Sequence, residues 1–371
     1  MNEELLTGHR RVSWRVDVLD QDDQTIGELA YTGTDSNGEP IAGGVVGGSF
    51  SRSNARTVRG TGTLDALGSY NTPFPVWRDV RLRPFYTLHD ISGEPVLSNP
   101  VGTYLPAVPE KTQEDGSSVF SINLYDKLLI PNRRRVTETY TAPAGTVVTE
   151  LAEHLLAEAG ERRVAVTHSD ETLRGPMTWE VGTTYLRIIN DLLDSINYFS
   201  LWCDGWGRYR IQPYQAPANR SITWTFEDTN RSIYAYGWTH ERDEFEVPNQ
   251  VILVSQPEGD DAPLTSTATN DDPDSPYSTV NVGHVNPILE EGVEATSQRV
   301  LDDIAARRLI EVGTVTSTFT LEHLWVPLEL NEVVRLRHGP SGTDIRAVLQ
   351  SDEFSMSLDS LVTSNLRELA S

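Results

Sequence analysis

The stretch "TTYLRIINDLLDSINYFSLWCDGWGRYRI", Thr183 to Ile211, decides how the middle of the chain folds. In its first half, apolar residues recur from Tyr185 at the three- and four-residue spacing of an amphipathic helix. The segment Phe199 to Cys203 then alternates apolar and polar residues, and so does Tyr209 to Ile211 after a glycine-containing turn. The sequence therefore predicts a helix followed directly by a β-hairpin.

The only cysteine, Cys203, lies on the apolar face of this hairpin. A nucleophilic thiol needs a lowered pKa and a base nearby, and the nearest histidines in sequence are His168 and His240. We interpret Cys203 as a small buried thiol packed beside aromatic rings, with a reactive thiol as the alternative. A single cysteine also excludes an intramolecular disulfide.

Strand-like alternation dominates the rest of the chain, with two further helices. One helix is expected from Thr146, as its cap, to Gly160, and another over Ala295 to Val312. The final nine residues suggest a frayed helix, and Glu258 to Ser278 a polar loop. Strands are expected at Val12–Val18, Val45–Ser53, Thr57–Leu64, Val80–Leu88, Val119–Leu124, Ile222–Phe226, Val251–Val254, Val315–Leu321, Val333–His338 and Ile345–Leu349.

Charge restricts the possible partners. The chain has 54 acidic and 30 basic residues, a formal net charge of −24. This balance opposes general attraction to nucleic acid or to an anionic membrane surface, so we expect no sequence-specific nucleic-acid binding. The start lacks the apolar stretch of a signal peptide and no run reaches membrane-spanning length, so no membrane segment is expected either.

Two motifs that suggest ligands fit structural roles better. The glycines of "AGGVVGG", Ala42 to Gly48, lack the Lys-Ser/Thr ending of a phosphate loop and are interpreted as bulge or close-packing positions. The cluster "NDDPDS", Asn270 to Ser275, lacks the carboxylate spacing of a calcium loop and is interpreted as a solvated loop.

Signatures of catalysis are weak. Only His168-Ser169-Asp170 places triad residue types together, and that spacing is too short for the usual relay. A carboxylate pair at glycosidase separation could arise among so many acidic residues, but sequence does not measure that distance. We therefore predict a protein that is not an enzyme, with no catalytic, cofactor-binding or metal-binding residues and no cofactor.

Aromatic residues gather between positions 202 and 238 and invite two interpretations. They are Trp202, Trp206, Tyr234, Tyr236 and Trp238. They could stack on sugar rings, or pack in a core or at a subunit interface. The alternation of the last three along one strand favours the core or interface.

The order of these parts resembles the tail hub proteins of tailed phages, which are also called minor tail or baseplate hub proteins. The resemblance rests on "INLYDKLL" (Ile122 to Leu129), the helix-plus-hairpin stretch quoted above, "VPNQVILV" (Val247 to Val254) and "SQRVLDDIAARRL" (Ser297 to Leu309). It spans nearly the whole chain, and its weight lies in the order of the parts.

This resemblance implies a mainly β, α+β fold: two barrel-like β-domains, residues 1–141 and 216–371, and a small α/β insert, residues 142–215. It implies a homotrimer at the tip of the virion tail, made in the host cytoplasm, that adapts a sixfold tail tube or distal tail ring to a threefold tip. The DNA channel would run through it. Its partners would be the distal tail protein or tube, the tape-measure protein, and tip or fibre proteins.

Two other classes of function stay open. A tail-associated carbohydrate-binding module would use the aromatic residues above for host recognition. A cell-wall hydrolase is motivated only by the abundance of carboxylates.

Overall fold

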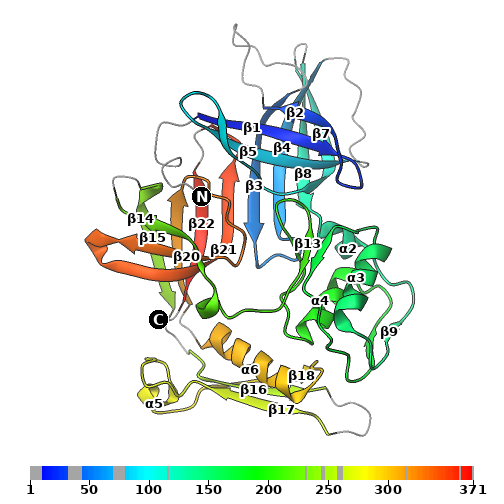
Figure 1. Cartoon of the computed structure of the whole chain (residues 1–371), viewed down its shortest axis with the longest axis vertical. Coiled ribbons are helices and arrows are strands. Elements are labelled where there is room, and N and C mark those ends of the chain that lie inside the picture. The colour runs from blue at the N-terminus through cyan, green and yellow to red at the C-terminus, as the bar shows by residue number, and fades with distance from the viewer. Residues whose placement is uncertain are drawn as a thin grey trace.

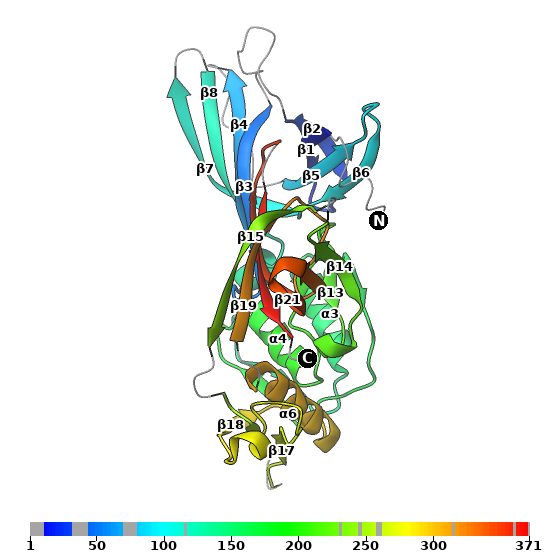
Figure 2. The same ribbon diagram turned by 90° about the vertical axis from the view of Figure 1, so that its left-hand side faces the viewer.

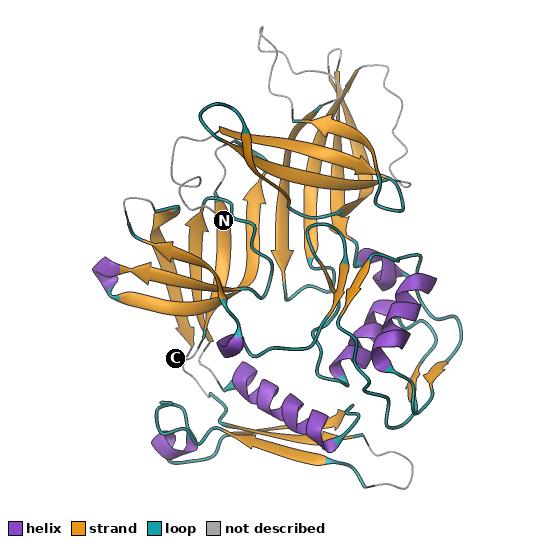
Figure 3. Ribbon diagram, in the orientation of Figure 1, coloured by secondary structure: helices purple, strands orange, loops and turns teal. Residues whose placement is uncertain are grey.

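The computed structural model describes residues 11–31, 44–69, 80–114, 117–229, 232–243, 247–256, 262–313, 316–358 and 361–369. Nearly half of these residues lie in strands, and the longer helices gather in two places beside the main sheet (Figure 3). The predicted fold class, α+β and mainly β, is confirmed.

Strands from before and after the insert form one 14-stranded sheet (Figure 1). The first half of the sheet comes from residues that precede the insert in sequence. The expected strand Val45–Ser53 is present there as β3. The strand expected at Thr57 begins later, at Gly60, because a turn occupies the residues in between. The strands of this half are β1 (Arg11–Leu19), β2 (Thr25–Ala30), β3 (Val45–Ser53), β4 (Gly60–Ser69), β5 (Arg81–His89), β6 (Pro95–Pro100), β7 (Tyr104–Glu114) and β8 (Ser117–Asp126).

The second half of the sheet follows the insert and ends the chain. The frayed helix expected for the final nine residues is wrong, because Val362–Glu368 is a strand whose residues Val362, Ser364 and Leu366 are buried. The strands of the second half are β14 (Ile222–Glu227), β15 (Tyr234–Asp243), β19 (Thr316–His323), β20 (Val333–His338), β21 (Thr343–Ser355) and β22 (Val362–Glu368).

The two halves repeat one strand order, which the sequence analysis missed. The first half runs β1-β5-β7-β8-β4-β3 across the sheet, and the second runs β14-β20-β21-β22-β19-β15. The strands also correspond one to one in chain order. One pairing differs, since β1 and β5 are antiparallel whereas β14 and β20 are parallel. The chain therefore contains two copies of one six-strand arrangement.

The halves join where β3 pairs with β21, antiparallel from Ser49↔Ser355 to Ser53↔Ser351. A shared core lies beneath this junction, with Phe50 and Phe354 at 5.5 Å and Trp14 stacked near both. Figure 2 shows β3, β4, β7 and β8 on one side of the first half and β1, β5 and β6 on the other. The barrel-like shape we expected is only approached, because the strand ladders do not close into a barrel.

The glycine-rich stretch behaves as predicted where the structure describes it. The pairing of β3 with β4 shifts register between Val45 and Gly47, which is a bulge. A Cβ atom at Gly48 would lie 2.6 Å from the carbonyl oxygen of Thr63, so close packing requires glycine there. Ala42 and Gly43 lie outside the described residues.

The helix-plus-hairpin insert has its own hydrophobic core, formed mainly by the buried faces of its two longer helices. The stripe predicted on Thr183–Ile196 is confirmed, and Thr184 caps the helix by accepting from the Arg187 N–H. The predicted cap at Thr146 is wrong, because its hydroxyl donates to Pro143 O and Val147 takes the cap position. Around this core lie two elements that begin before residue 142, α2 (Leu129–Arg133) and β9 (Tyr140–Ala142). The elements of the insert itself are α3 (Val148–Glu158), β10 (Val164–Val166), β11 (Met177–Trp179), α4 (Tyr185–Asp194), β12 (Trp202–Cys203) and β13 (Tyr209–Ile211).

A further small unit lies between β15 and β19, with a third hydrophobic cluster under its longest helix. The loop expected over Glu258–Ser278 is partly wrong, because Thr265–Thr269 pairs with a neighbouring strand as β17. The unit contains β16 (Gln250–Ser255), β17, α5 (Thr279–Val282), β18 (Pro287–Val293) and α6 (Gln298–Val312), and it lies at the bottom of Figure 1. No helix in the described residues is long and apolar enough to span a membrane.

Candidate functional site

The junction of the two halves carries a buried ion pair. Arg52 on β3 faces Asp352 on β21, its register partner, and its guanidinium bonds both carboxylate oxygens. A second carboxylate, Glu329, lies 3.1 Å from the same guanidinium. Burial would lower the pKa of Arg52, but Asp352 and Glu329 outweigh it and raise that pKa. One arginine therefore ties the two repeats together.

The same Glu329 also fixes the hairpin of the insert, by accepting the Gly205 N–H at 3.0 Å. Two glycines let the hairpin turn approach the sheet this closely. A Cβ atom at Gly205 would lie 2.7 Å from Pro100 O, and one at Gly207, where φ is +74°, would lie 2.9 Å from Thr103. The turn is therefore a docking element as well as a hairpin connection.

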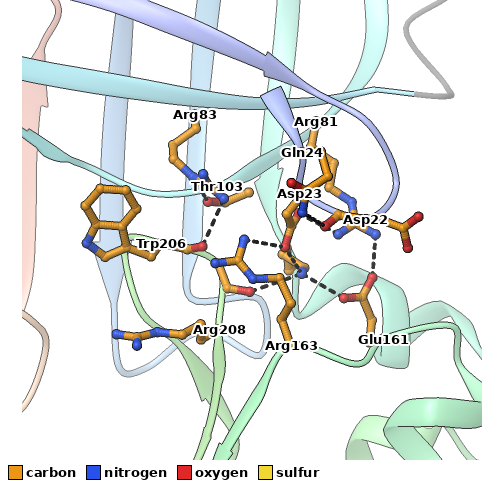
Figure 4. Close-up of polar contacts among 12 residues, drawn as sticks. Asp22, Asp23, Gln24, Arg81, Arg83, Thr103, Glu161, Arg163, Trp206 and Arg208 are labelled. Carbon is orange, nitrogen blue, oxygen red and sulfur yellow. Dashed lines mark hydrogen bonds and ion pairs between the residues drawn. The ribbon is translucent and has the colours of Figure 1, made fainter. Parts of the chain in front are cut away.

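A buried ion cluster joins the first half of the sheet to the insert (Figure 4). We call Asp23, Arg81, Lys127 and Glu161 the ion cluster. Lys127 Nζ lies 2.8 Å from Asp23 and 2.7 Å from Glu161, and Arg81 lies 2.6 Å from each of the same carboxylates. Both cations thus bridge both anions, and all four side chains are at most 7% exposed.

Each member of the ion cluster comes from a different part of the chain. Asp23 lies in the β1–β2 turn with φ +60°, Arg81 begins β5, Lys127 follows β8, and Glu161 follows α3. Burial would raise the pKa of Asp23, but Lys127 and Arg81 outweigh it and lower that pKa. The matched charges make the cluster a rigid connection between insert and sheet.

Arg83 extends this connection toward the hairpin turn. Its Nε donates to Thr103 Oγ1 at 2.9 Å, and its guanidinium donates to Trp206 O at 3.0 Å (Figure 4). Thr103 Oγ1 in turn lies 3.2 Å from Gly205 O. Polar contacts therefore continue along the docked face from the ion cluster to the turn.

Sequence reasoning did not find the ion cluster. Lysine is rare in this chain, with only Lys111 and Lys127, and this rarity was the one available signal. Nothing local connects Asp23 with Lys127, because 104 residues separate them.

Cys203 lies in a small cavity beside Asp126 and Tyr104. Burial raises the pKa of the thiol well above its usual value, and the nearby Asp126 raises it further. Burial also raises the pKa of Asp126 to about 7, although the Gly60 and Leu128 N–H groups favour its charged form. These conditions suit a packed thiol and oppose a nucleophilic one.

The other motifs form no reaction site. His168 is exposed, and its ring nitrogen lies 3.7 Å from a carboxylate oxygen of Glu153. The Ser169 backbone bonds the Thr149 hydroxyl, which donates to its carbonyl oxygen and accepts from its N–H. In the "NDDPDS" stretch, Asp272 accepts from the Asp274 N–H, as a turn requires. Within the described ranges, no group of three or more histidine, cysteine, aspartate or glutamate side chains could hold a metal ion.

The aromatic residues do not form one platform. Tyr234 is buried in the main core, and Trp238 packs on Phe319 at 5.2 Å. Trp206 is 43% exposed, but its ring meets the edge of Phe85 at 5.7 Å. The side chain of Tyr236 lies outside the described residues. The set is divided between the core of the sheet and the insert hairpin.

Two strands, β15 and β7, have an edge that is largely unpaired among the described strands. Among the described strands, β15 pairs only with β19. On the side away from β8, β7 forms one residue pair with the strands that the structure describes, Leu82↔Tyr104 with β5. Such edges carry backbone groups that can pair with another chain.

Solved structures share this arrangement over nearly its whole length. A tail protein from Neisseria meningitidis matches with a TM-score of 0.63 at 14% identity, covering 96% of this chain and 97% of that one. The 43 kDa tail protein of prophage MuSo2 from Shewanella oneidensis matches with a TM-score of 0.59 at 13% identity, covering 95% and 98%. The chain has the fold of phage tail proteins.

A prophage tail protein from Listeria monocytogenes gives the same result, with a TM-score of 0.54 at 11% identity, covering 97% of this chain and 95% of that one. No protein-family model and no curated protein sequence matches the chain. The resemblance to phage tail proteins is thus confirmed by the fold of the chain.

Proposed function

We propose that this chain is a structural virion protein, a tail hub that assembles as a homotrimer at the distal end of a phage tail. The observation that carries this proposal is the repeated six-strand arrangement. In the repeat, β3 corresponds to β15 and β7 corresponds to β21. Inside the chain, β3 of the first half pairs with β21 of the second. The equivalent contact between copies would pair β15 of one copy with β7 of the next.

Such a contact is heterologous, and heterologous contacts close into a ring when the rotation allows it. Three copies would place six similar sheets around one axis, which suits an adapter between a sixfold tube or distal tail ring and a threefold tip. It would also cover the free edges of β7 and β15. The net charge of −24 would discourage DNA from adhering to a channel through the ring.

The proposal includes the division into units expected from the sequence: β-domains at residues 1–141 and 216–371, each with one repeat, and the insert at 142–215. The role is architectural rather than enzymatic. The partners are a distal tail protein or tail tube, the tape-measure protein, and tip or fibre proteins, and the location is the tail tip of the virion.

The test is the rotational symmetry of the purified chain at high concentration, or of the particle that carries it. Class averages from electron microscopy, with native mass spectrometry, should give a threefold ring in which each copy contributes two similar sheets. A monomer at all concentrations, or a twofold dimer, would contradict the proposal.

A cysteine scan tests the contact itself. In a Cys203→Ala background, Thr239→Cys on β15 is combined in turn with single cysteines along β7, from Leu105 to Gln113. One or two neighbouring positions should form intermolecular disulfides, while the same scan along β1, from Val12 to Val18, should form none. A threefold ring that forms no cross-link to β7 would support the homotrimer but contradict the contact between β15 and β7.

A further inference from the structure

A cleft of about 370 Å³ lies where the insert, α6 and the second half of the sheet meet, and the tail role does not use it. Its lining residues come mainly from α4, α6, the turn between β3 and β4, the chain after the insert, β21 and β22. Six arginines and three carboxylates line it. In a chain with a net charge of −24, this local excess of positive charge is unusual.

The three carboxylates of the cleft already have arginine partners. Asp191 pairs with Arg187 at 2.8 Å, and Asp194 pairs with Arg307. Glu311 pairs with Arg308 at 3.1 Å. These pairs use three of the six arginines.

The other three arginines, Arg59, Arg220 and Arg367, form no ion pair with a described carboxylate. Arg59 donates to Ser200 O at 3.4 Å, and the nearby charge of Asp126 favours its charged form. Arg220 donates to the carbonyl oxygens of Gln215 and Asn331. The Arg367 side chain has no hydrogen-bond partner among the described residues. We call these three residues the free arginines.

The surroundings make this excess of positive charge costly. Burial lowers the pKa of Arg59 and of Arg220, and the neighbouring charge of Arg367 lowers that of Arg220 further. The Tyr214 ring has the Arg220 and Arg307 guanidinium carbons 5.7 and 5.4 Å from its centroid. An anion bound here would be attracted by half-buried cations that form no ion pair with a described carboxylate.

We infer that this cleft binds a carboxylate on an acidic segment of a partner protein, with the free arginines as its donors. Planar guanidinium groups match a carboxylate in a bidentate way. The rings of Phe199 and Tyr214 would cover the aliphatic part of a glutamate side chain.

A nucleic-acid backbone fits this cleft less well. The three paired carboxylates would face the neighbouring phosphates of a strand, and the overall charge of the chain repels a polyanion at longer range. The cleft has room for one or two side chains. It therefore suits a single carboxylate with a flexible peptide on either side.

The experiment titrates the full chain with acetylated tetraglutamate amide and, as a neutral control, acetylated tetraglutamine amide. Binding is followed by calorimetry and by the rise in melting temperature. Tetraglutamate should bind, weaken with added salt, and lose at least about tenfold in affinity in Arg367→Gln, because one charge-assisted interaction is removed. Arg335→Gln is the matched control, since Arg335 is paired with Asp344 elsewhere on the sheet, and it should bind normally.

Arg367→Gln keeps the test informative, because the Arg367 side chain makes no hydrogen bond to a described residue that the substitution would remove. Inorganic phosphate and a short oligothymidylate are titrated in parallel. Failure of tetraglutamate to bind, equal binding by the Arg367 variant, or tighter binding of phosphate or oligothymidylate would each overturn the inference. Because each titration is read on the isolated chain, its outcome is independent of the proposed trimer.

Discussion

The ion cluster around Lys127 and the cleft around Arg367 both border the insert, yet their charges are arranged in opposite ways. In the ion cluster, two cations bridge two anions, and every side chain is nearly or fully buried. In the cleft, three half-buried arginines have no carboxylate partner. Matched charges hold two parts of one chain together, whereas unmatched charges leave binding capacity for something outside it.

Both regions require a folded insert, so the largest expected effect comes from breaking its core. Ile189 on α4 is fully buried, and Ile189→Asp would place an unpaired charge among apolar side chains. We expect a loss of more than about 4 kcal/mol in the free energy of unfolding, measured by urea denaturation. Leu193→Asp should behave in the same way.

Ala157→Asp is the control for this change, since Ala157 is exposed on α3. It adds the same charge and should stay within about 1 kcal/mol of the wild type. Wild-type unfolding of both core variants would show that α4 does not pack as described.

The next largest effect on the free energy of unfolding should come from the ion cluster, and it can be compared with the removal of a lysine outside the cluster. Lys127→Met would leave Asp23 and Glu161 buried with one cation fewer, and we expect a loss of about 3–5 kcal/mol in the free energy of unfolding. The chain supplies a matched control in its only other lysine, because Lys111→Met should change the stability far less. Equal effects of the two substitutions would mean that the ion cluster is not a connection of special strength.

The features of these two regions that the sequence predicts are those set by residues close together in the chain. The helix of Thr183–Ile196 and the hairpin after it were predictable, because three- to four-residue and two-residue repeats report which face is buried. The strand at Val362 was missed, because Leu366 and Leu369 lie at helical spacing, and a serine, Ser364, interrupts the apolar two-residue repeat of the buried face. The partner strands β19 and β21 decide it.

The sites depend on long-range pairing, which leaves no local pattern. Arg52 and Asp352 are 300 residues apart, and the ion cluster draws its members from four separate elements. The six-strand repeat is likewise a repeat of strand order, and no repeated residue pattern was found in the sequence. Composition did indicate an acidic chain with scattered arginines, but not which arginines would lack partners.

Asp126 shows a third arrangement of charge, a buried carboxyl group that forms no ion pair with a described cation. Its effect can be measured by varying the pH. The pKa of Asp126 is about 7 in the folded chain, because burial disfavours its charge, against about 4 when unfolded. Between these values the folded state holds a proton that the unfolded state has released. Stability contributed by this group is therefore full below pH 4 and is lost as the pH rises toward 7, by up to about 4 kcal/mol.

Asp126→Asn removes this titration and should flatten the fall in stability between pH 4 and pH 7, measured as melting temperature against pH. The single oxygen of the amide can accept only one of the Gly60 and Leu128 N–H groups, which Asp126 accepts on separate oxygens. The variant should therefore also be less stable at every pH, while its pH slope is flatter. The ion cluster has the opposite sign, since the pKa of Asp23 is lowered and its contribution is lost only in acid. An unchanged slope in the Asp126 variant would assign the pH dependence to other groups.

The smallest expected change in stability is the one that most sharpens the comparison. Arg367→Gln removes a charge that has no partner and that lies near another cation, so the free energy of unfolding should stay within about 0.5 kcal/mol of the wild type or rise. Arg220→Gln should cost about 1–2 kcal/mol, because its bonds to the Gln215 and Asn331 carbonyl oxygens are lost. A large loss for Arg367→Gln would mean that its charge is balanced within the chain. The cleft would then be a structural connection like the ion cluster, and no external carboxylate would be needed to explain it.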